Sequence, residues 1–179
     1  MTHEDIRAAI AANPALVALV HAALAITGRA ATPEWQAIGA AVAQGRTRRA
    51  AERRLNELSV RAMLPPAQAV PLLRTLREVH DAADTPAWLA AALDGMGIAT
   101  AEHVIYLDTL QCGWRWLQSE KGLDVANDTT RQMLALLKTV RPALADACDA
   151  LTAAGDEAEH VDELDVRRAV LADDATVRV

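Results

Sequence analysis

The sequence predicts an all-α fold, one compact multi-helix domain whose helices pack as an irregular bundle. Three polar residues each precede a proline, which is typical of a helix start, because the polar side chain caps the first turn and the proline occupies the first helical position. These pairs are Asn13-Pro14, Thr32-Pro33 and Thr85-Pro86. Apolar residues recur at helical spacing along most of the chain. Strand signals are nearly missing, since only Ala175 to Val179 alternates in the way a strand does.

The first three predicted helices cover residues 3–12, 14–26 and 33–44 and are rich in alanine. Gly28 ends the second helix and Gly45 ends the third, because glycine adopts the left-handed conformation that closes many helices. The third helix carries Trp35, Ile38 and Val42 toward the core.

A fourth helix is expected from a cap at Thr47 to the Pro65-Pro66 pair, and we call it the arginine helix. Six arginines, no lysine and two acids lie between Gly45 and Arg61, although the net charge of the 179-residue chain is −6. On a helix, five of the arginines share one side, and Val60 falls among them. The five are Arg46, Arg49, Arg53, Arg54 and Arg61, and the opposite side carries the apolar stripe Ala51, Leu55, Leu58 and Ala62.

Three further helices are predicted in the middle of the chain, one of which begins after Thr85-Pro86. The other two carry clear apolar stripes. The first of the two covers residues 71–82 with the stripe Leu72, Leu73, Leu76 and Val79, because Pro71 would kink a helix that ran through it. The second follows Thr100 with the stripe Val104, Leu107, Leu110, Trp114 and Leu117. We expect Trp114 to be well buried. Gly113 costs helix stability relative to alanine, so we expect another backbone to approach it closely.

The last third of the chain predicts three more helices. Asn127 or Asp128 caps the first, Pro142 opens the second, which closes near Gly155, and the third covers residues 161–171. A small acidic loop at Thr152 to His160 separates the last helix from the body. We therefore expect a main helical domain at residues 1–155, with residues 156–179 forming an acidic loop and helix packed on that same domain.

Composition and motifs exclude several classes of protein. No run reaches the roughly 20 apolar residues of a membrane span, and the first segment lacks the pattern of a secretory signal. The two cysteines, Cys112 and Cys148, are expected to be buried free thiols, because no Cys/His spacing indicates zinc. The five histidines are dispersed, no nucleophile motif is present and no glycine-rich loop could hold a phosphate. We therefore expect no catalytic residues, no metal and no cofactor.

The five arginines of the arginine helix are the candidate interaction residues, because guanidinium groups bind carboxylates and phosphates through a planar, permanently charged fork. From Leu144 onward the chain carries ten acids against three arginines. The preferred interpretation is that the basic helix pairs with carboxylates, of a neighbouring subunit or of this same chain. A merely solvated face and a surface that binds nucleic-acid phosphates are the alternatives.

Four segments resemble a group of small tailed-bacteriophage proteins. They are IRAAIAANPALVAL at Ile6 to Leu19, AVAQGRTRR at Ala41 to Arg49, GLDVANDTTRQMLALL at Gly122 to Leu137, and VDELDVRRAVL at Val161 to Leu171. The motif residues are Gly45, Arg46, Thr47, Gly122, Asp124, Asp128, Thr130 and Arg131. This chain carries a longer insertion at about residues 22–34. The resemblance implies a phage-encoded virion component or assembly factor, with no catalytic residues to transfer.

The sequence thus predicts a non-enzymatic structural or interaction protein of the head, neck or tail of a tailed phage. Its expected partner is a copy of itself or a neighbouring phage structural protein, in a homo-oligomer or a larger assembly, with neither nucleic acid nor membrane. The expected location is the virion, or the host cytoplasm during assembly. We do not expect the protein to be secreted. The alternative is a nucleic-acid-binding regulator that uses the basic helix from Arg46 to Arg61.

Overall fold

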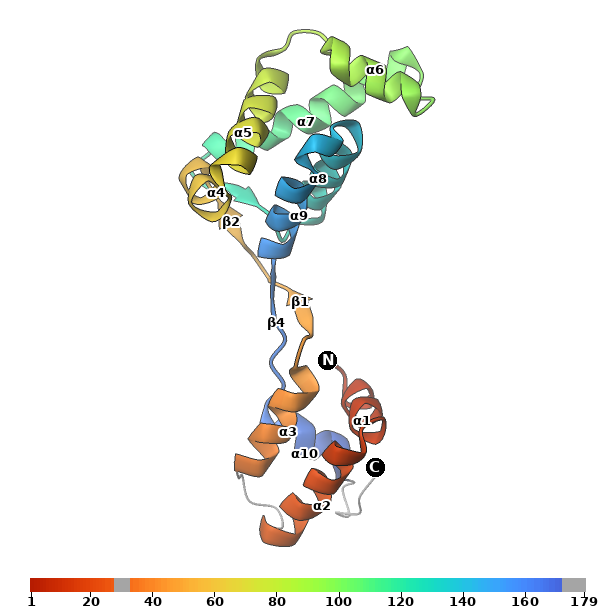
Figure 1. Ribbon diagram of the computed structural model, residues 1–179, viewed down its shortest axis with the longest axis vertical. Coiled ribbons are helices and arrows are strands. Elements are labelled where there is room, and N and C mark those ends of the chain that lie inside the picture. The colour runs from red at the N-terminus through yellow and green to blue at the C-terminus, as the bar shows by residue number, and fades with distance from the viewer. Residues whose placement is uncertain (28–32, 172–179) are drawn as a thin grey trace. The chain divides into compact units, whose positions relative to one another are not determined.

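Helices dominate the computed structural model, which describes residues 1–27 and 33–171, and the predicted all-α class is confirmed. Figure 1 shows the elements in chain order. The helices are α1 (His3–Ala11), α2 (Pro14–Thr27), α3 (Pro33–Ala43), α4 (Glu57–Met63), α5 (Pro66–Asp81), α6 (Ala87–Gly95), α7 (His103–Gln118), α8 (Asp128–Val140), α9 (Ala145–Ala154) and α10 (Glu163–Val170). The short strands are β1 (Thr47–Arg49), β2 (Arg54–Leu55), β3 (Leu123–Asp124) and β4 (Asp156–Ala158). Single 3-10 turns at Thr100–Glu102 and Pro142–Leu144 precede α7 and α9.

Side-chain caps begin several of these helices, as the sequence indicates. Thr2 and Asp5 form a capping box at α1, in which each side chain accepts a hydrogen bond from the other residue's backbone. Asn127 caps α8 through Thr129, which agrees with the predicted start. Asp162 caps α10 through the backbone N–H of Asp165. The predicted helix end at Gly28, the cap at Thr32 and the alternating stretch at 175–179 lie outside the described residues.

The chain divides into two compact units, each with its own core. Unit 1 comprises Met1–Arg48 and Ala158–Val179, and unit 2 comprises Arg49–Glu157. β1 is hydrogen-bonded to β4 in one two-stranded sheet, and β2 is hydrogen-bonded to β3 in another. We expected one main domain at residues 1–155 with the C-terminal helix packed on it. The structure divides that range between two units, and the C-terminal helix packs on the N-terminal helices of unit 1.

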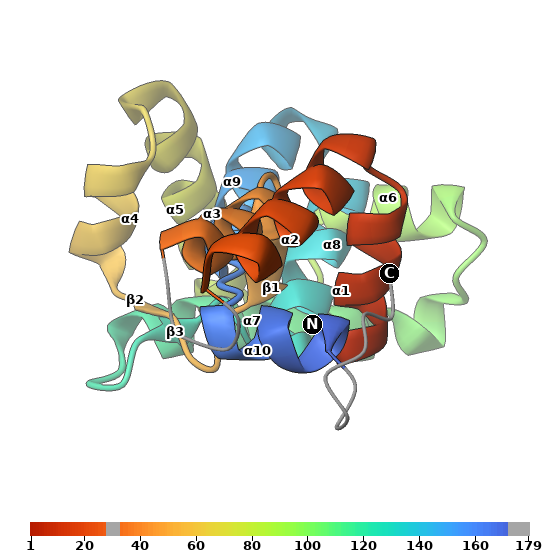
Figure 2. The same ribbon diagram turned by 90° about the horizontal axis from the view of Figure 1, so that it is seen from below.

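Unit 1 brings the C-terminal helix α10 against α1 and α3 (Figure 1, Figure 2). Its core combines Ile6, Ile10, Trp35 and Ile38 with Val166, Ala169 and Val170 of α10. Gly39 makes this packing close, because a Cβ added there would lie 2.4 Å from the carbonyl oxygen of Val161. The three N-terminal helices therefore complete their core with a helix from the far end of the sequence, a partner that periodicity alone does not identify.

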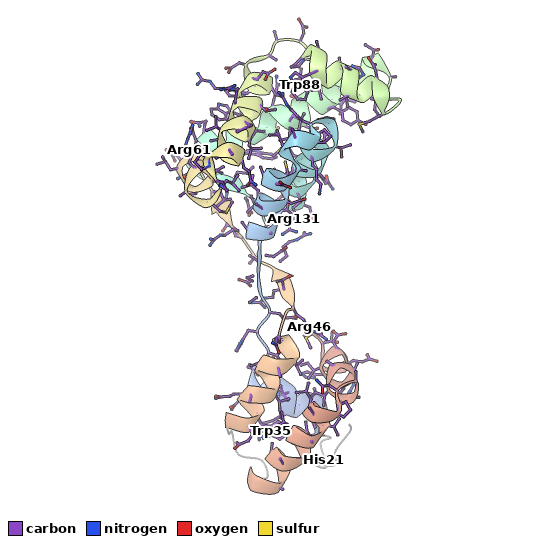
Figure 3. The ribbon with its side chains drawn as sticks, in the orientation of Figure 1. His21, Trp35, Arg46, Arg61, Trp88 and Arg131 are labelled. Carbon is purple, nitrogen blue, oxygen red and sulfur yellow. The ribbon has the colours of Figure 1, made fainter. Side chains whose placement is uncertain are left out.

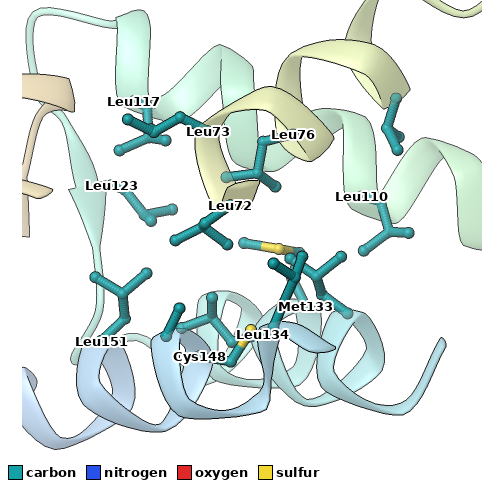
Figure 4. Packing of buried hydrophobic residues seen from close by; sticks show 14 of the residues in the cluster. Leu72, Leu73, Leu76, Leu110, Leu117, Leu123, Met133, Leu134, Cys148 and Leu151 are labelled. Carbon is teal, nitrogen blue, oxygen red and sulfur yellow. The ribbon is translucent and has the colours of Figure 1, made fainter. Parts of the chain in front are cut away.

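Unit 2 is built around α5, α7, α8 and α9, whose apolar stripes meet in one core (Figure 4). Leu72 and Leu76 of α5, Leu110 of α7, and Met133 and Leu134 of α8 are fully buried. Gly113 faces the side chains of Met133 and Leu76, not another backbone as we expected. Trp114 is only half-buried, so the prediction of a well-buried Trp114 is wrong, and Trp35 of unit 1 is instead the fully buried tryptophan. Trp35, which is among the labelled side chains of Figure 3, lies on α3.

The predicted arginine helix does not exist. The segment forms β1, a connection, β2 and the seven-residue helix α4. β2 pairs antiparallel with β3 through Arg54 opposite Asp124 and Leu55 opposite Leu123, and the backbone of Arg53 bonds both Val125 and the Asp124 carboxylate. These tertiary hydrogen bonds outweigh the local helical preference, because a strand partner satisfies the same backbone groups.

The break also changes which residues of this segment are buried. The Asn56 side chain accepts a hydrogen bond from the backbone N–H of Ser59 and caps α4. The helix therefore begins at Glu57, and the faces of its residues differ from those expected for a helix that begins at Thr47. Leu58 of the predicted apolar stripe is consequently 75% exposed, whereas Val60, which we placed among the arginines, is fully buried.

α5 begins at Pro66 and runs through Pro71, although we expected a start at residue 71. Pro71 cannot donate a hydrogen bond to the carbonyl of Ala67. Ala67 and Pro71 are both exposed, so water can reach this end of the helix.

Candidate functional site

The five arginines predicted as an interaction face are dispersed by the fold. Arg49 pairs with Asp128, Arg54 pairs with Glu52, and Arg61 pairs with Glu57 across one helical turn. The Arg53 side chain is exposed, and Nη1 of Arg46 lies 3.2 Å from Sδ of Met1. Arg46 belongs to unit 1 and the other four to unit 2. The predicted face is therefore not formed, and three of its members already have carboxylate partners within the chain.

The motif residues of the phage resemblance within unit 2 support the backbone. Gly122 adopts a positive φ of 75°, and a Cβ there would meet the carbonyl of Leu55 at 2.9 Å. Asp124 accepts hydrogen bonds from the backbone N–H groups of Arg53 and Ala126. Arg131 donates to the carbonyls of Val125 and Thr152 and to the Asp156 carboxylate. Through these contacts, the motif residues connect β2, β3 and the start of α8.

A different group of arginines lines a depression that we call the α5 groove. It has a volume of about 620 Å³ and lies between α4, α5 and α7. Its lining consists of Glu57, Arg61, Val70, Leu73, Arg74, Arg77, His80, Asp81, Trp114 and Gln118. Of the five predicted arginines, Arg61 alone lies in it; Figure 3 labels Arg61 on α4.

Helical spacing explains why these side chains converge. Glu57 and Arg61 are four residues apart on α4, and Trp114 and Gln118 are four apart on α7, so each pair shares one face. On α5 the apolar stripe of Leu72, Leu76 and Val79 faces the core. Arg74 and Arg77 therefore emerge on the outer side. The sequence contains this spacing, but which helices pack beside α5 is decided by the tertiary fold.

Two of the three arginines in the α5 groove are already paired with acids. Nη2 of Arg61 lies 2.7 Å from Oε1 of Glu57, and Gln118 donates to the other carboxylate oxygen at 2.9 Å. The hydrogen bond from Arg61, followed by the one from Gln118, lowers the pKa of Glu57 below its usual value. Arg77 lies 3.6 Å from Asp81, and both side chains are largely exposed. Such an exposed pair contributes little and opens easily for another anion.

Arg74 is the unpaired cation of the α5 groove. Within residues 1–27 and 33–171, its side chain makes no ion pair or hydrogen bond. One turn before it, Val70 is 43% exposed, and the half-buried Trp114 lines the same groove, whereas Leu73 is almost fully buried. The groove thus offers the unpaired guanidinium of Arg74 next to apolar and aromatic side chains. Such a site suits a ligand in which an anionic group has apolar groups beside it.

The described part of the chain offers no arrangement suited to metal binding or a membrane span within one helix. It holds no group of three or more His, Cys, Asp or Glu residues that could bind a metal ion. No single described helix is long and apolar enough to cross a membrane. Taken together, α1 and the first part of α2 have the required length and apolar composition, but the two helices meet at a bend of 109°. Cys112 and Cys148 are free, as predicted, but only Cys148 is buried, and Cys112, which we also expected in the core, is half-buried. Burial raises the pKa of the Cys148 thiol to about 12.

The sequence analysis missed Arg74, Arg77 and Trp114 as members of a surface site. Arg74 and Arg77 are three residues apart and lie off the α5 stripe, and this spacing was the available signal. Comparison of this chain with protein-family models, with curated proteins and with solved structures finds no match.

Proposed function

We propose that this chain is a non-enzymatic interaction protein that binds an acidic segment of another protein in the α5 groove. The resemblance to small tailed-phage proteins supports the more specific proposal of a virion component or assembly factor of the head, neck or tail. The partner is then a copy of this chain or a neighbouring phage structural protein, in the particle or in the host cytoplasm during assembly.

The observation that carries the proposal is the unpaired Arg74 beside Val70 and Trp114. A carboxylate of a partner would form a charge-assisted hydrogen bond with Arg74, and the apolar residues beside that carboxylate would cover Val70 and Trp114. Glu57 and Asp81 line the same groove. This mixture of signs favours a protein segment, whose charges are also mixed, over a polyphosphate backbone.

The alternative, a nucleic-acid-binding regulator that uses a basic helix from Arg46 to Arg61, has lost its structural basis. These arginines do not share one helix, and three of them pair with acids of this chain. The net charge of −6 adds repulsion toward a polyanion.

Pairwise co-expression with the products of the flanking genes tests the proposal. The tagged full chain and its Arg74→Glu variant are each purified with every neighbour, and sedimentation velocity measures self-association. Arg168→Glu is the matched control, because Arg168 is an exposed arginine on α10 and makes no ion pair within the described residues. We expect a structural neighbour or a second copy to bind the wild-type chain and the control but not Arg74→Glu.

Two results would overturn the proposal. One is that no neighbour and no second copy binds, or that binding survives Arg74→Glu unchanged. The other is that duplex or single-stranded DNA binds at physiological salt with an affinity that falls steeply as salt rises, which is the signature of phosphate contacts.

A further inference from the structure

A second depression, of about 340 Å³, adjoins the α5 groove. Val70 and Arg74 line both depressions, so the two meet along this turn of α5. The second one continues over Pro71 and Thr75 to Arg141 and Leu144, at the end of α8 and the turn before α9. Together they form a path that crosses α5, with the free guanidinium of Arg74 at the crossing.

Arg141 provides the other cation of this path, and it is held in place before any ligand binds. Its guanidinium carbon lies 4.7 Å from the ring centre of Trp88, which is a cation–π contact. Nη1 of Arg141 lies 3.7 Å from Glu78, and the indole N–H of Trp88 donates to the same carboxylate at 2.8 Å. Contacts on both sides therefore limit the positions that the guanidinium can take.

The hydrogen-bonding capacity of Arg141 is not used up by these contacts. Nη1 is buried and makes no hydrogen bond, and its separation from Glu78 exceeds hydrogen-bond distance. A buried donor without an acceptor costs free energy. A carboxylate bound beside Arg141 would supply the acceptor that Nη1 does not find among the described residues.

We infer that the occupant of the path is an acidic protein segment in extended conformation, which crosses α5 over Val70 and places one carboxylate on Arg74 and another on Arg141. This inference rests on the proposed function and names its ligand. Side chains of an extended segment alternate between two sides, so acids at every second position face α5 together. A carboxylate fits better than a phosphate, because Glu57 and Asp81 line the α5 groove and Glu78 lies beside Arg141, and these carboxylates repel a dianion more strongly than a monoanion.

Fluorescence anisotropy with labelled ten-residue peptides tests this inference on the full chain. The first probe carries three glutamates alternating with three valines between glycine-serine ends, and the second replaces each glutamate by glutamine. An oligothymidylate of ten nucleotides is the third probe. We expect the glutamate peptide to bind about tenfold or more tightly than either other probe, as the loss of a charge-assisted hydrogen bond implies.

Three variants locate the binding. Arg74→Gln should weaken binding of the glutamate peptide about tenfold, and Arg168→Gln should leave it unchanged. Arg141→Lys keeps the charge but loses the planar fork, so we expect a smaller loss of about threefold. Far-ultraviolet circular dichroism and the unfolding midpoint of each variant confirm that the fold is retained.

Equal binding of the glutamine peptide, unchanged binding by Arg74→Gln, or tighter binding of the oligothymidylate would overturn the inference. Its failure is distinguishable from failure of the proposed function. If the glutamate peptide does not bind while a flanking-gene product still binds through Arg74, the extended acidic ligand is wrong and the proposed function stands. If the peptide binds through Arg74 but no structural protein does, the ligand class stands and the proposed function falls.

Discussion

Nη2 of Arg131 lies 2.5 Å from Oδ1 of Asp156, which joins the first turn of α8 to strand β4. The same guanidinium donates to the carbonyls of Val125 and Thr152. It is 18% exposed, so most of its charge is shielded from water. One side chain therefore connects the start of α8 with the end of α9 and with strand β4, at sequence separations of 21 and 25 residues.

We expect Arg131→Met to lower the free energy of unfolding by about 2–4 kcal/mol, because it removes the donor of a partly buried carboxylate and of the Val125 carbonyl, whereas the Thr152 carbonyl still accepts from the Gly155 backbone N–H. Urea unfolding followed by circular dichroism measures this change. Arg115→Met is the matched control, since Arg115 is exposed and lies 3.9 Å from Asp108. The control should lose less than about 1 kcal/mol. Equal losses in the two variants would show that the Arg131 contacts add nothing.

Gly155→Ala should destabilise unit 2 by about 1–3 kcal/mol, because the new Cβ would lie 2.4 Å from the carbonyl oxygen of Val125. Gly95→Ala provides the contrast, since a Cβ there meets no atom within 4 Å. At the end of α6, alanine should be neutral or stabilise by up to about 1 kcal/mol. Thermal unfolding of both variants checks the difference, and an unchanged midpoint for Gly155→Ala would contradict the packing.

Trp35→Ala should cost about 3–5 kcal/mol, because Trp35 is fully buried in the core of unit 1. Trp114→Ala should cost less, about 1–2 kcal/mol, because the half-buried ring lines the α5 groove and its loss opens a surface rather than a cavity. Denaturant titrations of both variants measure the two losses. A larger loss for Trp114→Ala would reverse the assignment of core and surface tryptophan.

The two cysteines should differ in reactivity. Burial raises the pKa of Cys148 from an ordinary value near 9.0 to about 12, so its thiol stays neutral at pH 8 and is shielded from reagent. Cys112 is half-buried and should react with a disulfide reagent in the native protein. Cys112→Ser should therefore abolish native labelling, and Cys148→Ser should leave it unchanged. Labelling of Cys148 before unfolding would contradict this burial.

Residues 49–157 should fold without the rest of the chain. They form their own core, and a hydrogen bond from Ala50 to the carbonyl of Gly155 joins the two ends of the fragment. A domain with a separate core can fold alone. We expect the purified fragment to show a helical spectrum and a cooperative urea transition. A broad, non-cooperative transition would mean that unit 2 depends on unit 1.

Helix starts were predictable where capping and proline chemistry act within a few residues. Asn13 before α2 and Asn127 before α8 mark boundaries that the structure confirms. The arginine segment failed because its periodicity suits a helix while its backbone partners, Asp124 and Val125, come from a distant part of the chain. The α5 groove shows the same limit, since Arg74 and Trp114 meet only when α5 packs beside α7.

The sequence by itself determined the all-α class, most helix starts, the apolar stripe of α5 and the free thiols, because these depend on contacts within one or two helical turns. The predicted stripe of α7 is right only in part, since Val104 is exposed and Trp114 half-buried. Only the tertiary structure decided that α10 completes the core of α1 and α3 and that the arginine segment divides into β1, β2 and α4. It also decided that Arg74 has no carboxylate partner among residues 1–27 and 33–171. Apolar, alanine-rich stripes of similar composition would allow many different pairs of helices to pack together. Which pairs form depends on the shapes of the packed side chains and on hydrogen-bond partners that are distant in sequence, and no local pattern specifies either.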